Sequence, residues 1–266
     1  MQSQRKSALF TALLIAAGAG SVEADERKFT YSYEAKTLPQ GTWEFEQWAT
    51  LQTRKEAGDW NTLLLREEIE YGITDRLTTA IYLNSEYQAN SGVPGFEDEH
   101  SFGFASMSSE WKYKLSDPSA DVLGSLLYGE LSFSPSSYEI EAKLVLSKQA
   151  GRFTFVYNFI YEAEVEEEPE ESPVWRWEHV ISNTLGASYA VLDNFSVGVE
   201  AMDVFRNTPV EDNKTHAYFV GPNVHYSSGG WWATFTVLRQ VSINGLELTD
   251  GDNTKWQFRL IFGVNF

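Results

Sequence analysis

Glutamate is the side chain with the clearest chemical potential in this sequence, and several glutamates recur at every second position. Glu44 and Glu46 form one such pair, and Glu68 and Glu70 form another. Residues two apart on a β-strand project from the same face, so this spacing predicts rows of carboxylates on one side of a sheet. Such rows can attract cations, exchange protons or pair with lysine and arginine side chains.

Metal and thiol chemistry have less support. The sequence has no cysteine and only four histidines, which excludes disulfides, thiolate metal sites and a cysteine nucleophile. Segment 162–171 holds seven glutamates, and hard cations such as calcium prefer carboxylate oxygens. It lacks the Asp, Asn and Gly spacing of a preformed cation loop, so a solvated acidic loop is the favoured interpretation. We expect no metal site and no cofactor.

The bulk composition indicates a protein with two different faces. Aromatic residues make up 15% of the chain, yet the mean hydropathy is -0.33. Membrane β-barrels produce this combination, because one face of every strand meets lipid and the other meets water. The formal net charge of -18 repels phosphate groups, so we expect no nucleic-acid partner.

The N-terminus has the pattern of a secretory signal peptide. Arg5 and Lys6 precede an apolar run over 8–17, and Val22-Glu23-Ala24 fits a cleavage site. The run is shorter than the roughly 20 residues that a membrane helix needs. We expect residues 1–24 to be removed, residues 25–40 to form a periplasmic segment, and residues 41–266 to form one domain. An uncleaved anchor or a buried first helix is the alternative.

Period-2 alternation of apolar and polar residues recurs along the rest of the chain and predicts about 12 strands. The predicted strands cover 42–53, 62–72, 77–88, 102–115, 122–133, 138–148, 153–164, 177–191, 195–204, 215–226, 231–241 and 255–266. Most reach ten residues, whereas strands of soluble proteins average about five or six. The predicted fold is all-β, a single antiparallel transmembrane β-barrel; a soluble β-sandwich or a lipocalin-like barrel is the alternative.

The connections alternate between tight turns and longer loops, as in outer-membrane barrels. The tight ones include 192–194 and 227–230, and the long ones span 90–100, 165–176, 207–214 and 242–254. We therefore expect both chain ends at the turn side, in the outer membrane of a Gram-negative bacterium.

Aromatic side chains occupy the positions that should face lipid. One strand offers Phe153, Phe155, Tyr157, Phe159 and Tyr161, and the last strand offers Trp256, Phe258 and Leu260. Interfacial girdles are expected from Trp43, Tyr71, Trp111, Tyr113, Trp177, Tyr189, Tyr226 and Trp232. The terminal Phe266, with Phe262 and Val264 before it at spacing two, resembles the signal that the barrel assembly machinery recognises. Outer-membrane lipid and that machinery are the expected partners.

The opposite strand faces carry the charges expected to line the lumen. Eleven carboxylates and seven basic side chains are predicted there: Glu44, Glu46, Glu68, Glu70, Glu86, Glu110, Glu139, Glu141, Glu162, Glu178, Glu200, Arg66, Lys112, Lys114, Lys143, Arg239, Lys255 and Arg259. In a water-filled path the surplus of carboxylates would favour cations. The alternative is a lumen closed by side chains that pair with one another.

Enzymatic activity is not expected, although some outer-membrane barrels hydrolyse lipids with a Ser/His pair on the outer wall. A serine nucleophile needs a histidine within hydrogen-bond reach. The only His-x-Ser is His225-Tyr226-Ser227, at a predicted turn on the lumen face; His100 and His216 fall in or beside loops, and His179 faces lipid. We assign no catalytic residue.

The stretch from Glu68 to Leu83, with its tight turn Gly72-Ile73-Thr74-Asp75-Arg76, is similar to an uncharacterised family of outer-membrane barrels. That family neighbours the porin-like barrels associated with a phenol-degradation meta pathway. The resemblance implies a porin-like or transport-associated barrel for small molecules of unknown identity. A closed structural or adhesive barrel acting through its external loops is the first alternative, and a lipid hydrolase is the second.

Overall fold

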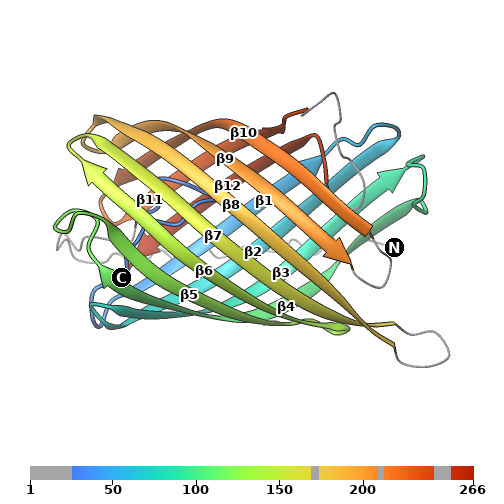
Figure 1. Ribbon diagram of the computed structural model, residues 1–266, viewed down its shortest axis with the longest axis horizontal. Coiled ribbons are helices and arrows are strands. Elements are labelled where there is room, and N and C mark those ends of the chain that lie inside the picture. Colours follow the sequence, from blue (N-terminus) through green and yellow to red (C-terminus); the bar gives the residue numbers. More distant parts are fainter. Residues whose placement is uncertain (1–25, 169–173, 209–212, 243–252) are drawn as a thin grey trace, which may run out of the picture.

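Twelve antiparallel strands close into a single barrel in the computed structural model, which describes residues 26–168, 174–208, 213–242 and 253–266 (Figure 1). The strands are β1 (Trp43–Thr53), β2 (Asp59–Thr74), β3 (Leu77–Ser91), β4 (Glu99–Ser116), β5 (Gly124–Phe133), β6 (Ser137–Ala150), β7 (Phe153–Glu168), β8 (Val174–Leu192), β9 (Phe195–Thr208), β10 (Asn213–Ser228), β11 (Trp231–Gln240) and β12 (Trp256–Asn265). The predicted all-β, twelve-stranded barrel is confirmed.

The first and last strands close the ring. β1 pairs with β12 from Glu44 opposite Asn265 to Thr53 opposite Trp256. Closure satisfies the backbone hydrogen bonds of every strand without leaving a free edge, which is what a bilayer demands of a sheet. No helix able to cross a membrane occurs among the described residues.

The two ends of the barrel differ. The turn end holds the two-residue connections after β2, β6, β8 and β10 and the C-terminus, and it lies at the left of Figure 1. The opposite, loop end holds the connections after β1, β3, β5, β7, β9 and β11. Most strands run beyond their predicted ends toward the loop end, where β7 continues to Glu168. The alternation of apolar and polar residues is weaker near the loop end, which is why the sequence pattern underestimated the length of these strands.

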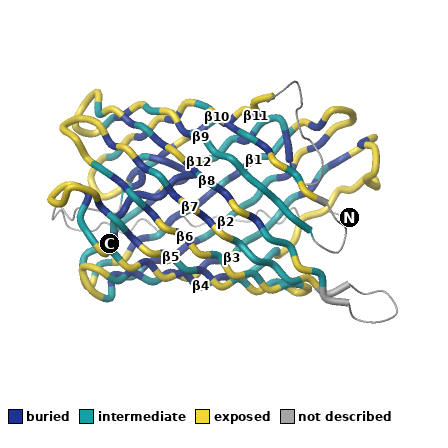
Figure 2. The backbone as a smooth tube through the Cα atoms, viewed as in Figure 1, coloured by how far each residue is buried: buried dark blue, intermediate teal, exposed yellow. Residues whose placement is uncertain are grey.

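The outer face is apolar along most strands, as the alternation predicted. Phe153, Phe155, Phe159 and Tyr161 of β7 are all exposed, while the intervening Val156 and Asn158 are buried inside. Figure 2 shows this alternation as a change of colour from residue to residue along the strands. The wall therefore presents an apolar, aromatic-rich surface of the kind that lipid covers.

Strand β11 has the opposite facing to the one predicted. Trp232, expected in an interfacial girdle, is fully buried inside, and its Nε1 donates to Glu44 Oε1 at 3.1 Å. Arg239, expected in the lumen, projects outward and lies over the ring of Trp256. Both errors have one cause, because a shift of one residue moves every side chain of a strand to the other face. The more polar set, with Thr234 and Thr236, is the inner one.

Most of the stretch 25–40, expected in the periplasm, instead lies inside the barrel, whereas Gln40 and the following Gly41 are exposed. Residues 26–42, called here the lumen segment, enter at the turn end and return to the turn end to begin β1. Residues 29–35 are buried without interruption, and Figure 2 shows the segment as a largely buried tube within the ring. It forms no strand or helix, so its backbone groups must find partners among lumen side chains.

Candidate functional site

Glu200 of β9 is the main anchor of the lumen segment. Its carboxylate accepts hydrogen bonds from the backbone N–H groups of Thr30, Tyr31 and Ser32 at 2.8–2.9 Å. Thr236 of β11 donates a fourth hydrogen bond to the same group at 2.7 Å. A buried carboxylate satisfied by several donors is a strong local tether, because each bond is charge-assisted. The deepest part of the segment is therefore held by a side chain that the sequence analysis assigned to the lumen wall.

Polar side chains from other strands hold the rest of the segment. The Asn158 side chain bonds both the N–H and the carbonyl of Tyr33, and Ser147 accepts from the N–H of Ala35. Thr78 accepts from the N–H of Leu38 at 2.9 Å. The tethers come from β3, β6, β7 and β9, so they span much of the ring.

Apolar packing completes the closure of the turn-end half. Tyr33 and Ala35 pack with Trp48, Leu126, Tyr128, Val145, Trp232 and Ile261 in one buried cluster. Phe29 lies so close to β8 that a Cβ at Gly186 would come within 2.6 Å of its ring. Small residues in the wall thus make room for large ones in the segment.

Within the segment, Glu34 receives the Lys28 N–H at 2.9 Å and the Lys36 ammonium at 3.0 Å. Burial by itself would raise the pKa of Glu34, but the charges of Lys36 and Lys28 outweigh it and lower the pKa below its ordinary value. Glu34 is therefore ionised, and it joins the part of the lumen segment that precedes it, at Lys28, to the part that follows it, at Lys36.

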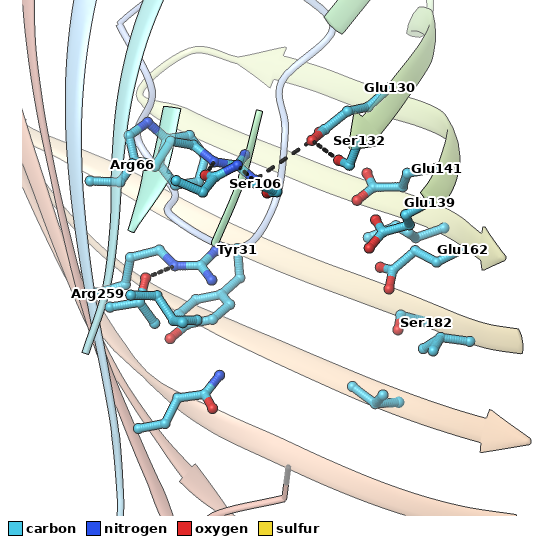
Figure 3. Close-up of a pocket in the computed structure, with 18 of the residues that line it drawn as sticks. Tyr31, Arg66, Ser106, Glu130, Ser132, Glu139, Glu141, Glu162, Ser182 and Arg259 are labelled. Atoms are coloured by element: carbon cyan, nitrogen blue, oxygen red, sulfur yellow. Dashed lines mark hydrogen bonds and ion pairs between the residues drawn. The ribbon is translucent and has the colours of Figure 1, made fainter. Parts of the chain in front are cut away.

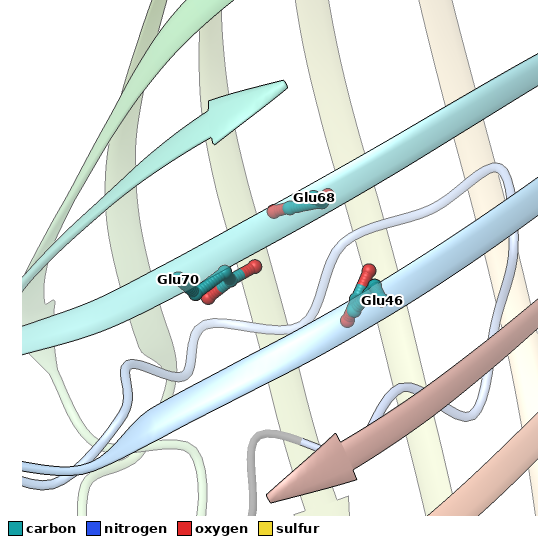
Figure 4. Close-up of side chains that lie close together, drawn as sticks. All are labelled: Glu46, Glu68 and Glu70. Carbon is teal, nitrogen blue, oxygen red and sulfur yellow. The ribbon is translucent and has the colours of Figure 1, made fainter. Parts of the chain in front are cut away.

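A buried acidic cluster lies beside the segment, where Glu46, Glu68 and Glu70 bring carboxylate oxygens within 4.8 Å of one another (Figure 4). Lys112 Nζ lies 2.8 Å from both oxygens of Glu70, and the guanidinium of Arg27 lies 3.9 Å from Glu46. Oxygen ligands of this kind suit hard cations. Because the lysine and the arginine already supply positive charge there, the cluster acts as an internal ion-pair network of the closed half.

A cavity of about 550 Å³ occupies the loop-end half of the lumen (Figure 3). Its lining includes Tyr31 and Tyr33 of the lumen segment, together with side chains from most strands. Burial raises the pKa of Tyr31 to about 12, so this phenol stays neutral. A separate, smaller cavity of about 260 Å³ opens among the turns at the other end, bounded by Glu26, Lys28 and His225. The lumen segment divides the interior into these two spaces.

The charges around the larger cavity are partly separated by sign, with Lys143 and Arg206 as the bases outside the arginine side. Arg66 of β2 and Arg259 of β12 flank β1, whereas Glu139, Glu141 and Glu162 belong to β6 and β7. In a ring of twelve, β7 lies six strands from β1, so the two groups face each other across the cavity, as Figure 3 shows.

These opposed charges are only partly compensated. Arg66 forms an ion pair with Glu130 at 3.7 Å, and Glu141 pairs with Lys143. Arg259 contacts Thr50 Oγ1 and the Thr30 carbonyl, but no carboxylate of the described residues lies in ion-pair range. Glu139 and Glu162 likewise have no hydrogen bond or ion pair with any residue that the structure describes.

The predicted lumen charges thus fall into groups. Buried against the lumen segment or beside it lie Glu44, Glu46, Glu68, Glu70, Glu110, Lys112 and Glu200. Bordering the large cavity lie Arg66, Lys143, Glu162 and Arg259. Glu86 shares the inner face of β3 with Tyr82 and Gln88 but does not border that cavity.

The histidines are scattered rather than gathered. His225 lies inside, with Nδ1 2.8 Å from Thr234 Oγ1 and Nε2 3.5 Å from Glu26. His179 is on the outer wall as expected, within hydrogen-bond distance of Tyr161. His216, expected beside a loop, is within β10 on the outer wall and lies 3.2 Å from Asp203.

Sequence analysis missed the lumen segment as part of the site, although a signal was present. Phe29, Tyr31, Tyr33 and Ala35 alternate with Thr30, Ser32 and Glu34, a pattern that would have predicted a thirteenth strand. Both sets are buried, because the segment is surrounded on all sides by the wall. Local periodicity cannot distinguish such a segment from a strand.

The closed ring, the apolar outer face and the polar interior define a β-barrel of the outer-membrane class. The chain belongs to the family of unknown function DUF6662, whose model matches residues 21–266. No curated protein shows a significant sequence match.

Solved structures with the same architecture are outer-membrane barrels of low sequence identity. The COG4313 outer membrane channel from Pseudomonas putida F1 is similar with a TM-score of 0.63 and 14% identity, covering 87% of this chain and 98% of that one. The NanC porin is similar with a TM-score of 0.52 and 11% identity, over 84% and 98% of the two chains. The β domain of the Bordetella autotransporter BrkA has a TM-score of 0.53 and 12% identity, over 86% and 100%. These likenesses establish the fold; the link to a phenol-degradation pathway stays a prediction.

Proposed function

We propose that this protein is a porin-like channel for small solutes in the outer membrane of a Gram-negative bacterium, reached after removal of residues 1–24. Solutes enter the loop-end cavity, and the lumen segment closes the turn-end half until it is displaced. The observation that carries the proposal is the cavity of about 550 Å³ lined by charges that the wall leaves uncompensated. A purely structural interior would pair such charges, since isolated charges away from bulk water are costly.

Two of the similar structures are an outer membrane channel and a porin, and their likeness to this barrel supports the same function. The surplus of carboxylates around the cavity favours cations, because low-dielectric walls focus the field of unbalanced charge. Conduction requires movement of the lumen segment, since the two cavities lie on either side of it.

A reversible disulfide between the lumen segment and the barrel wall tests two parts of the proposal: that the barrel conducts, and that conduction requires movement of the segment. Because the chain has no cysteine, Ala35→Cys with Ser147→Cys introduces a single pair where the Ala35 N–H meets Ser147 Oγ at 2.9 Å. In planar lipid bilayers we expect cation-selective current steps from the reduced pair, their loss on oxidation and their return on reduction. Each single-cysteine variant is the matched control and should not respond to oxidant.

A closed barrel that acts through its loops is the second candidate, favoured by the dense filling of the turn-end half. It predicts no current from the wild type or from the reduced cysteine pair. Under that function, neutralising Glu46 and Glu70 should lower thermal stability without changing permeability. Activity as a lipid hydrolase is not proposed.

A further inference from the structure

The cavity at the loop end has a polarity that selects one chemical class of solute. Arg259 presents a guanidinium from β12, and its neighbours Thr50 and Tyr31 position that group without neutralising it. Nη1 is held by the Thr30 carbonyl at 3.1 Å, so the arginine is oriented by the closed lumen segment itself.

The opposite wall is acidic. Glu139 of β6 and Glu162 of β7 border the cavity without a basic partner among the described residues. Two bases border the cavity near these glutamates. Lys143 is occupied by Glu141 and by the rings of Tyr33 and Tyr128 at 4.2 and 3.9 Å, and Arg206 forms an ion pair with Glu178. The glutamates and the arginine are drawn on opposite sides of the space in Figure 3.

We propose that this cavity binds small zwitterions, solutes that carry an ammonium group at one end and a carboxylate at the other. The ammonium faces Glu139 and Glu162, and the carboxylate faces Arg259. A simple cation would make charged contacts with the acidic wall alone, and a simple anion would make them with the arginines alone. A zwitterion satisfies both walls with charge-assisted hydrogen bonds, which are stronger than neutral ones.

The remaining lining fits the same class. Serine hydroxyls at Ser106, Ser132 and Ser182 and the amide of Asn84 surround the space between the two walls. They can donate to or accept from the polar middle of an amino-acid-like or peptide-like solute. A volume of about 550 Å³ accommodates a molecule of that size. The inference deepens the proposed channel function and rests on it.

Binding is measured by titration calorimetry with the protein purified in detergent, so that it is read without conduction. The probes are γ-aminobutyrate, butyrate and butylamine, which share one carbon skeleton and differ only in their charged ends. We expect γ-aminobutyrate to bind at least about tenfold more tightly than either single-charge probe, because it makes two charged contacts instead of one. A series from β-alanine to ε-aminocaproate should show one preferred chain length.

Substitutions test which side chains contact the carboxylate and which contact the ammonium of the solute. Arg259→Gln should reduce γ-aminobutyrate binding to the level of butylamine, and Arg259→Lys should restore part of it. Glu139→Gln combined with Glu162→Gln should reduce it to the level of butyrate. Arg76→Gln and Glu97→Gln remove the same charge types at exposed positions outside the cavity and serve as matched controls. Resistance of each folded variant to sodium dodecyl sulfate before heating reports that the barrel is intact.

Equal binding of γ-aminobutyrate and butylamine by the wild type, or no binding of γ-aminobutyrate, overturns the inference. So does unchanged binding in both the arginine and the glutamate variants. A barrel that conducts without this selectivity leaves the channel function standing and removes the inference. Zwitterion binding by a barrel that never conducts supports the binding inference and removes the proposed channel function.

Discussion

The carboxylate of Glu200 accepts the backbone N–H of Tyr31 at 2.8 Å, although 169 positions separate the two residues in the chain. This contact fixes the deepest part of the lumen segment against β9 and thereby sets the floor of the loop-end cavity. The charge that was expected to face a water-filled path is used instead to hold an irregular backbone inside the ring.

Replacing Glu200 by glutamine should release the segment. The amide keeps the size of the side chain but has one acceptor oxygen and no charge, so backbone donors at 30–32 lose partners. We expect a loss of about 2–3 kcal/mol of stability, since each buried unsatisfied donor is costly. Thermal unfolding in detergent measures this, and Glu97→Gln in an exposed loop is the control. An unchanged melting temperature would contradict the anchoring role.

Gly186→Ala should displace Phe29, because the added Cβ would lie 2.6 Å from the phenyl ring. We expect faster proteolysis within residues 26–42 and a higher open probability in bilayers. The double variant Gly186→Ala with Phe29→Ala removes the overlap with the phenyl ring and leaves the contact with Val156 Cγ2 at 2.7 Å, so its effect should be smaller than the sum of the two single effects. Strict additivity would show that the two residues do not interact.

Gly263→Ala should destabilise the barrel at the β11–β12 pair. A Cβ at position 263 would overlap the buried indole of Trp232, which lies opposite it in the register. Overpacking of this kind costs about 1–3 kcal/mol. Gly129→Ala is the matched control, because a Cβ there meets no atom within 4 Å. Equal unfolding temperatures for the two variants would refute the packing argument.

Acid should loosen the lumen segment through Glu34. Its pKa is lowered in the folded protein, so its contribution to stability is complete above the unfolded value of about 4.3 and is lost as the pH falls through the folded value. We expect wild-type proteolysis within 26–42 to accelerate below about pH 4. Glu34→Gln should be more susceptible at neutral pH and show less acceleration in acid; identical pH profiles would exclude Glu34 as the sensor.

Removal of Phe266 should impair insertion into the outer membrane more than it impairs the folded barrel. Its N–H donates to the Trp43 carbonyl at 3.0 Å and its carbonyl accepts from the Trp43 N–H at 3.2 Å, so two closing hydrogen bonds are lost in addition to the predicted assembly signal. The fraction of protein recovered in outer-membrane vesicles measures the effect. Phe266→Tyr keeps an aromatic terminus and both backbone hydrogen bonds, so it should assemble normally. Normal insertion of the variant that lacks Phe266 would contradict the predicted signal.

Sequence periodicity by itself determined the architecture of this protein. Alternation in strands such as 153–164 depends only on a residue's immediate neighbours, because the two faces of each strand meet different surroundings. The same reasoning failed on β11, where Trp231 and Trp232 are adjacent aromatics and either could have faced lipid. Trp232 is the one that faces inward, because Gly263 lies opposite it and leaves room for its indole. This pairing depends on the register between two strands.

The lumen segment and the polarity of the cavity were decided only by the tertiary structure. No local pattern tells that Glu200, Asn158 and Thr78 converge on one backbone, because they lie on three strands far apart in the chain. Arg259 and Glu162 face each other for the same reason: closing twelve strands into a ring places β12 and β7 on opposite sides. Alternation determines which face a side chain occupies, whereas closure of the ring determines which side chains meet.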